Sequence, residues 1–226
     1  MLRRISWTRP PSVNASLAYV VVGLAWALLS GTPAWFVPVL WVGIAGQYVP
    51  GVANQVTLAR AYLAAPALLY ALHGEFGALA VCVALAGLTD MVDGTIARRF
   101  GSPSQLGGGL DPVVDGLFMG ALVLGLAWGG TIPWWLAFVV IWRYFLPALA
   151  GGLLLASGRR PELRHTLTGQ ISTTLILVLI GGVCLLRGLH QDYSGLLLGA
   201  EVVIPLATVA TYVHLFVATA RHPAVK

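Results

Sequence analysis

Charge is scarce in this sequence. Asp, Glu, Lys and Arg make up only 9% of its 226 residues, and the mean hydropathy is +0.85. So apolar a composition excludes an ordinary soluble domain. Cysteine is scarce as well: Cys82 and Cys184 lie in separate apolar segments, which excludes a disulfide framework and offers no metal-binding spacing. The net charge of +5 fits attraction to anionic lipid head groups, and we expect no nucleic-acid partner.

The long apolar runs predict an all-α polytopic membrane protein, because runs of about 20 residues match a hydrocarbon core roughly 30 Å thick. We expect six spanning helices, at residues 54–72, 77–97, 110–128, 134–156, 168–186 and 196–218. They would form one core domain, residues 54–226. Residues 1–53 form an N-terminal segment with apolar stretches at 17–29 and 35–49. We expect two further helices there, with a re-entrant or interfacial hairpin, or a cleaved signal peptide for the first stretch, as alternatives.

Positive charge predicts the orientation. If all eight helices span, both termini lie on one side of the membrane, together with the connections at 98–109 and 158–167. That side collects Arg3, Arg4, Arg9, Arg60, Arg98, Arg99, Arg159, Arg160, Arg164, Arg221 and Lys226. Arg187 falls on the other side, and Arg143 lies within a helix. The positive-inside rule makes the first side cytoplasmic, which predicts a bacterial inner-membrane protein.

Aspartate is concentrated where acid is least expected. Four of the eight acidic residues fall between Asp90 and Asp115 in an apolar region. The register is Asp90-x2-Asp93-Gly94-x2-Ala97-Arg98-x8-Gly107-x3-Asp111-x3-Asp115. A single Asp at a helix end is commonly a cap, but four at apolar helix ends indicate a functional site, since isolated charge is costly in hydrocarbon.

The spacing of these aspartates predicts a metal site. Residues three or four apart share a helix face, so Asp90 converges with Asp93 and Asp111 with Asp115. Such a cluster would repel itself without a counter-charge. Mg²⁺ or Mn²⁺ suits carboxylate oxygens, and no His or Cys lies nearby to favour zinc. Gly94 and Ala97 leave a bare helix surface for a ligand, and Arg98 offers a fork for phosphate oxygens.

This register resembles the signature of the CDP-alcohol phosphatidyltransferase family. Asn54-x2-Thr57-x2-Arg60 likewise resembles the polar start of the family's first core helix, which helps form the nucleotide site. The resemblance implies a six-helix membrane enzyme, commonly a homodimer, in which an alcohol attacks CDP-diacylglycerol and releases CMP. Asp90, Asp93 and Asp111 would be ligands of two metal ions, and Asp115 both a ligand and the general base. The nucleotide would lie against Asn54, Thr57, Asp90, Gly94, Ala97, Arg98 and Gly107.

The acceptor alcohol is less clearly indicated. Arg143 matches the arginine of the Arg-Glu pair of phosphatidylglycerophosphate synthase-like members, but Tyr144 replaces the Glu. Where those members have Gly-Lys-x-Lys-Thr, this sequence reads Gly169-Gln170-Ile171-Ser172-Thr173. Glycerol 3-phosphate is the favoured acceptor, with a phosphate held by candidates Arg143, Arg159, Arg160 and Arg164. An inositol phosphate, a lipid or an unphosphorylated acceptor is the alternative.

Two other classes of protein could place carboxylates or helices in a membrane. A divalent-cation transporter would have acidic groups near the midplane of several helices and openings to both faces. Here the aspartates cluster near one face, beside residues suited to phosphate. A non-catalytic scaffold would explain the helices alone, and neither class accounts for the complete register.

Overall fold

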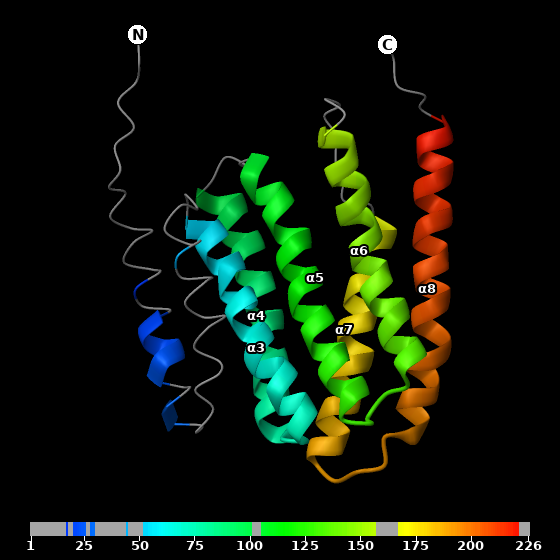
Figure 1. Cartoon of the computed structure of the whole chain (residues 1–226). Helices are drawn as coiled ribbons and strands as arrows, with labels where there is room; N and C mark the ends of the chain where they lie inside the picture. Colours follow the sequence, from blue (N-terminus) through cyan, green and yellow to red (C-terminus); the bar gives the residue numbers. More distant parts are fainter. Residues whose placement is uncertain are drawn as a thin grey trace. The chain divides into compact units, whose positions relative to one another are not determined.

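The computed structural model describes residues 17, 20–25, 28–29, 44, 52–100, 105–156 and 167–221. The helices are α3 (Val52–His73), α4 (Phe76–Phe100), α5 (Gln105–Trp128), α6 (Trp134–Ala156), α7 (Leu167–Gly188) and α8 (Ser194–Arg221) (Figure 1). No β-strand occurs among the described residues. The prediction of an all-α fold is confirmed for this part of the chain.

The six predicted core helices correspond to α3 through α8, and α6 has the predicted bounds. Each of the other five extends a few residues beyond its predicted span. The largest difference is at α5, which begins at Gln105 rather than at residue 110 and contains both Gly107 and Pro112. Glycine is a local helix breaker, and Gly107, Gly108 and Gly109 directly precede residue 110, so the sequence pattern placed this start too late.

The N-terminal prediction is only partly covered. Residues 17, 20–25 and 28–29 of the first predicted stretch are helical, as is residue 44 in the second. The remainder of both stretches lies outside the described residues, so the choice between two full helices and a hairpin stays a prediction.

The chain forms two compact units, both of which draw on α3, α4 and α5. The first comprises Met1–Leu69 and Cys82–Ala121, and the second comprises Tyr70–Val81 and Leu122–Lys226. The four aspartates of the register therefore belong to the first unit. Arg143, the best-described acceptor candidate, belongs to the second.

In the first unit, α3 presents small side chains where it is buried. Ala61, Ala64 and Ala67 are all buried, and such residues allow another helix to approach closely. Leu58 and Ala61 form a buried apolar cluster with Val114 of α5. This cluster fixes α3 next to α5 at the level of Arg60, which lies between Leu58 and Ala61, and of Asp115, which follows Val114.

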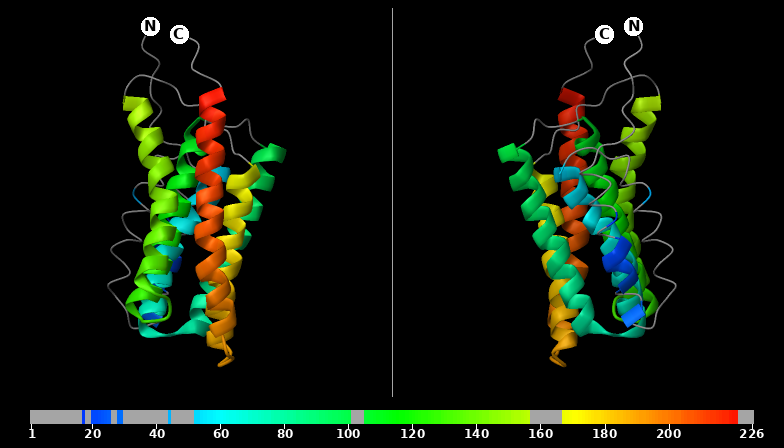
Figure 2. Two further views of the ribbon diagram at one scale, coloured as in Figure 1. Left: turned by 90° about the vertical axis from the view of Figure 1, so that its right-hand side faces the viewer. Right: turned by 90° about the vertical axis from the view of Figure 1, so that its left-hand side faces the viewer.

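In the second unit, α8 packs along α7 and also contacts α6 (Figure 2). A glycine permits the close approach of α7 to α8, since a Cβ atom at Gly182 would lie only 2.7 Å from Cδ2 of Leu196. The fully buried apolar side chains of this unit include Leu122, Leu126, Leu136, Val140, Ile176, Ile180, Val183 and Ile204. Burial of these side chains is the main stabilising contribution within the unit.

Three short connections end their helices in the same way. A residue with positive φ follows α3, α5 and α7: Gly74 (74°), Gly130 (70°) and His190 (57°). The next N–H then donates to a carbonyl five residues back, in the pairs Glu75–Tyr70, Thr131–Leu126 and Gln191–Leu186 (2.8–2.9 Å). This is the Schellman turn, which satisfies exposed helix carbonyls and reverses the chain in a few residues.

Asp192 caps the start of α8. Its Oδ1 accepts from the Ser194 N–H (2.9 Å) and its Oδ2 from the Ser194 hydroxyl (3.0 Å). These hydrogen bonds lower the pKa of Asp192, and the one from the Ser194 backbone has the larger effect. The exposed carboxylate therefore satisfies a donor at the beginning of the helix, as helix-capping aspartates do.

Two described segments are long and apolar enough to cross a membrane, Ile171–Gly188 and Ser194–His214. Shorter apolar helical stretches are Phe76–Thr89, Pro112–Trp128 and Trp134–Leu146. In α4 the apolar stretch stops before Asp90, whereas in α5 it begins after Asp111 and includes Asp115. Two of the six predicted spans thus qualify by length and composition alone.

Candidate functional site

The backbone places the aspartate register on two successive helices of one unit. Asp90 and Asp93 lie toward the C-terminal end of α4, and Asp111 and Asp115 lie toward the N-terminal end of α5. The connection between these helices, residues 101–104, is outside the described residues. The predicted placement of two aspartate pairs at facing helix ends is thus consistent with the helix bounds.

The structure describes the side chain of Asp115 but not those of the other three aspartates. Gly94, Ala97 and Arg98 fall in the last turns of α4 and Gly107 in the first turn of α5, again by backbone only. No cluster of three or more acidic, His or Cys side chains occurs among the described ones. Convergence of the four carboxylates on metal stays a prediction.

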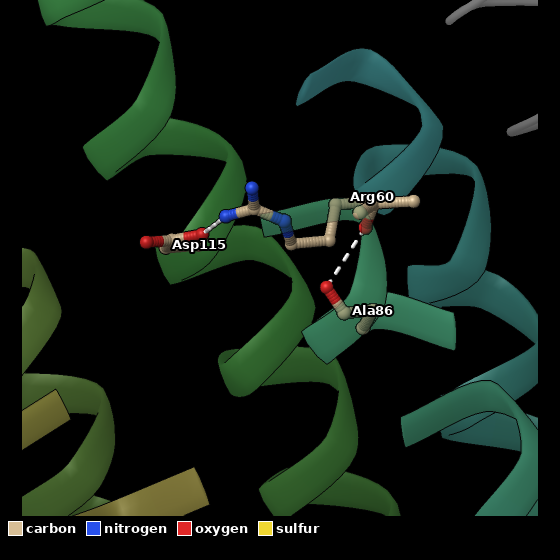
Figure 3. A network of polar contacts seen from close by, with 4 residues as sticks. Arg60, Ala86 and Asp115 are labelled. Carbon is tan, nitrogen blue, oxygen red and sulfur yellow. Dashed lines mark hydrogen bonds and ion pairs between the residues drawn. The ribbon is translucent and has the colours of Figure 1, made fainter. Parts of the chain in front are cut away.

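Asp115 forms an ion pair with Arg60 of α3. The Nη1 atom of Arg60 donates to Oδ1 of Asp115, across 55 residues of sequence (Figure 3). The Arg60 side chain is only 4% exposed, whereas that of Asp115 is 23% exposed. The pair therefore has a buried cationic end and a carboxylate that solvent or substrate can reach.

Thr57 lies one turn before Arg60 on α3 and is buried, with 6% of its surface exposed. Residues three apart share a helix face, so Thr57 lies on the face of α3 that carries Arg60. Asn54 begins the same row in the first turn of α3, although its side chain is outside the described ones. The row Asn54, Thr57 and Arg60 thus lies in the same unit as the aspartate register.

In the second unit, Arg143 connects α6 to α7. Its side chain is buried (7% exposed), and Nη2 donates to the Gly169 carbonyl at 3.4 Å. The Nε atom of Arg143 has no hydrogen-bond partner among the described residues. The other acceptor candidates, Arg159, Arg160 and Arg164, lie outside the described residues. Arg143 is therefore a buried cation with donor capacity to spare.

The sequence motif at the start of α7 also lies close to Arg143. Thr173 donates its hydroxyl to the same Gly169 carbonyl (3.0 Å). Ser172, which stands where phosphatidylglycerophosphate synthase-like sequences have a lysine, is 2% exposed, and its Oγ has no described partner. The Gly169 carbonyl thus accepts hydrogen bonds from side chains of α6 and α7. Three residues further along α7, the buried Ser172 hydroxyl can still make a hydrogen bond.

Sequence reasoning missed the polar contacts that α8 contributes here. The Tyr212 hydroxyl donates to the Trp142 carbonyl (3.0 Å), and a hydrogen bond of 2.9 Å joins Thr168 Oγ1 to His214 Nδ1. It also left Arg60 out of the candidate site, although Arg60 was visible as the last member of its row. An arginine in an apolar helix is itself the signal that a carboxylate or phosphate partner should be sought.

A model of the CDP-alcohol phosphatidyltransferase family matches residues 51–219 of the chain. The match takes in the row from Asn54 to Arg60, the complete aspartate register and Arg143. No solved structure matches the chain.

Several curated proteins are similar to this chain. A probable phosphatidylglycerophosphate synthase from Mycobacterium tuberculosis is 30% identical over 179 residues, covering 75% of this chain and 84% of that protein. A probable cardiolipin synthase (CMP-forming) from Drosophila melanogaster is 41% identical over 92 residues, 40% of this chain and 28% of that protein. The cardiolipin synthase (CMP-forming) of Streptomyces coelicolor is 37% identical over 79 residues, 35% of this chain and 37% of that protein.

Proposed function

The chain belongs to the CDP-alcohol phosphatidyltransferase family, and we propose that it transfers the phosphatidyl group of CDP-diacylglycerol to glycerol 3-phosphate with release of CMP. The observation that carries the proposal is the aspartate register, which lies within the matched residues and falls on successive helices of one unit. The choice of acceptor follows the relative named probable phosphatidylglycerophosphate synthase, whose alignment covers 75% of this chain.

The aspartate register fits Mg²⁺ or Mn²⁺. Asp90, Asp93, Asp111 and Asp115 offer carboxylate oxygens, the donors that these hard cations prefer. We assign two ions to these four residues. When bound, the ions supply charge neutralisation at the diphosphate and at the departing CMP.

Asp115 is the general base of the proposed reaction. The acceptor's hydroxyl oxygen forms a bond to the phosphatidyl phosphorus, and the bond from that phosphorus to the CMP oxygen breaks. Asp115 takes the hydroxyl proton, which its partial exposure permits while Oδ1 is bound to Arg60. No covalent enzyme intermediate is needed.

We assign nucleotide binding to α3 and α4. Gly94 and Ala97 lack bulk, so the cytidine diphosphate can approach the α4 backbone, and Arg98 can donate to its phosphate oxygens. Thr57 supplies a buried hydroxyl from α3. Asn54, Asp90 and Gly107 complete the nucleotide set that the family resemblance implies.

The acceptor phosphate is assigned to Arg143 and its neighbours in the second unit. A buried guanidinium is unfavourable without a counter-charge, and the described hydrogen-bond partner of Arg143 is a neutral carbonyl at a long 3.4 Å. An acceptor phosphate would supply that charge. Ser172 Oγ can add a hydrogen bond from the same end of α7. Arg159, Arg160 and Arg164 remain candidates for further phosphate contacts.

Phosphatidylglycerol is the second candidate acceptor, because two of the relatives are named cardiolipin synthases (CMP-forming). It would also explain why Gln170 and Ser172 replace the lysines of phosphatidylglycerophosphate synthase-like sequences. Both acceptors would attack through a hydroxyl group, and they differ in charge and size.

We also propose that the protein is integral to the bacterial inner membrane and acts as a homodimer. Apolar side chains follow one face of α8 and are more than half exposed: Leu198, Val202, Leu206, Val209 and Val213. Such a stripe suits lipid contact. Trp128 and Trp134, which pack edge to face with ring centroids 5.7 Å apart, would anchor a membrane interface at the C-terminal end of α5, with Trp135 beside them. The active site would then face the cytoplasm.

The experiment that tests this function uses the purified protein, CDP-diacylglycerol and Mn²⁺ or Mg²⁺ with a panel of acceptors. The panel contains glycerol 3-phosphate, inositol phosphate, free inositol and phosphatidylglycerol, and the readout is CMP release. We expect glycerol 3-phosphate to give the highest kcat/KM. Turnover with phosphatidylglycerol alone would reassign the acceptor, and no CMP release with any acceptor would refute the proposed activity.

A further inference from the structure

The ion pair between Arg60 and Asp115 is asymmetric. Arg60 is almost entirely buried, whereas the Asp115 carboxylate is partly exposed. Figure 3 shows one carboxylate oxygen of Asp115 directed at the guanidinium and the other directed away from it. The pair thus uses one oxygen of Asp115 and leaves the second available.

The surroundings of the pair hold it in place. Leu58 and Ala61, on either side of Arg60 in sequence, pack with Val114, the residue before Asp115. The ion pair and this apolar cluster therefore join α3 to α5 at the same level. Neither charged residue can move far without disturbing buried packing.

Burial of Arg60 argues against its release when another cation approaches Asp115. Removing one partner of a buried ion pair is strongly destabilising, because the remaining charge is left unpaired in a medium of low dielectric. A cation that approaches Asp115 should therefore leave its bond to Arg60 in place. The ion pair should persist in the metal-free and in the metal-loaded protein.

We propose that Arg60 is a positioning residue for Asp115, which it holds through Oδ1 during turnover so that Oδ2 faces the acceptor hydroxyl. The role rests on the proposed function of Asp115 as general base. A catalytic carboxylate must be held within a narrow range of orientations by the groups that bond it, and Arg60 is the described group that does so.

The first test measures unfolding temperatures in detergent with EDTA for the wild type, Arg60→Gln, Asp115→Asn and the double variant. We expect each single substitution to lower the unfolding temperature by several degrees and the double variant to lie above Asp115→Asn, because it removes the unpaired buried charge. Additive effects would show that the two side chains are not coupled, and would overturn the proposal. This test needs no catalytic activity, so it stands even if the proposed function fails.

The second test compares Arg60→Gln with the wild type in EDTA and in saturating Mn²⁺. A persistent ion pair predicts similar losses of unfolding temperature in both conditions. A loss that disappears in Mn²⁺ would mean that the metal displaces Arg60, which would contradict a positioning role during turnover. If Arg60→Gln does not fold, the same comparison is made with Arg60→Lys, which keeps the charge but not the planar donor fork.

The third test separates positioning from substrate binding. Loss of a residue that orients a catalytic group commonly lowers activity about 10- to 100-fold, and here we expect that loss in kcat, with KM for CDP-diacylglycerol nearly unchanged. Arg60→Lys should recover part of the kcat. The control is Arg187→Gln, which removes an arginine that stacks on Phe76 and Tyr193 and should leave kcat unchanged. Unchanged kcat in Arg60→Gln, or a loss confined to KM, would overturn the proposal.

Discussion

The substitution Arg143→Gln separates two contributions of Arg143, one to the stability of the fold and one to acceptor binding. The guanidinium makes one described hydrogen bond, 3.4 Å long, to the neutral Gly169 carbonyl. So long a bond contributes little, and its loss should change the free energy of unfolding by about 1 kcal/mol or less. A charge-assisted hydrogen bond to phosphate contributes about 1.5–3 kcal/mol. Losing it should raise KM for glycerol 3-phosphate about 10- to 150-fold, since each 1.4 kcal/mol corresponds to about a factor of ten.

The assay measures CMP release against glycerol 3-phosphate concentration, at saturating CDP-diacylglycerol and Mn²⁺. Arg187→Gln is the matched control, since it removes a guanidinium from the last turn of α7, where Arg187 donates to the Tyr193 hydroxyl. We expect KM to rise only in Arg143→Gln, with KM for phosphatidylglycerol less affected. An unchanged KM for glycerol 3-phosphate, or an equal rise in the control, would refute the assignment of acceptor phosphate to Arg143.

Three further predictions concern other parts of the chain. Gly94→Leu should abolish binding of CDP-diacylglycerol in a direct binding assay while the protein stays folded, because the side chain would fill the surface assigned to cytidine diphosphate; unchanged affinity would place the nucleotide elsewhere. A cysteine at position 104 in place of Ser104 should react with membrane-impermeant reagents only from the cytoplasmic side, and labelling from outside would reverse the proposed orientation. Gly129→Ala should lower the free energy of unfolding by about 1–3 kcal/mol, because the added Cβ would lie 2.7 Å from the Ala71 carbonyl oxygen. The control is Gly120→Ala, which should leave the free energy of unfolding unchanged because its Cβ would meet open space.

The sequence was sufficient to predict the helices α3 through α8, and it contains the aspartate register on which the proposed chemistry rests. Long apolar runs separated by turn residues gave the positions of α3 through α8, and α6 at Trp134–Ala156 agrees residue for residue. The start of α5 was predicted too late, because local propensity treats Gly107, Gly108 and Gly109 as breakers while the helix continues through them. Hydropathy reports which segments are apolar and is a weaker guide to where a polar helix end lies.

The contacts between helices could not be predicted from the sequence in the same way. Arg60 and Asp115 are 55 residues apart, and Tyr212 reaches the Trp142 carbonyl across 70 residues. Periodicity assigns a residue to a helix face but does not say which helix lies opposite. The partner of Arg60 and the contacts among α6, α7 and α8 therefore depend on packing that only the three-dimensional structure provides.

Release of CMP from CDP-diacylglycerol, measured side by side for the wild type and Asp93→Asn, tests the central claim most directly. With glycerol 3-phosphate and Mn²⁺, the wild type should release one CMP for each lipid product formed, and EDTA should stop the reaction. Asp93→Asn should release none, because one ligand of the assigned metal pair loses its charge. Full CMP release by Asp93→Asn, or by the wild type in EDTA, would contradict a metal-dependent transfer centred on these aspartates.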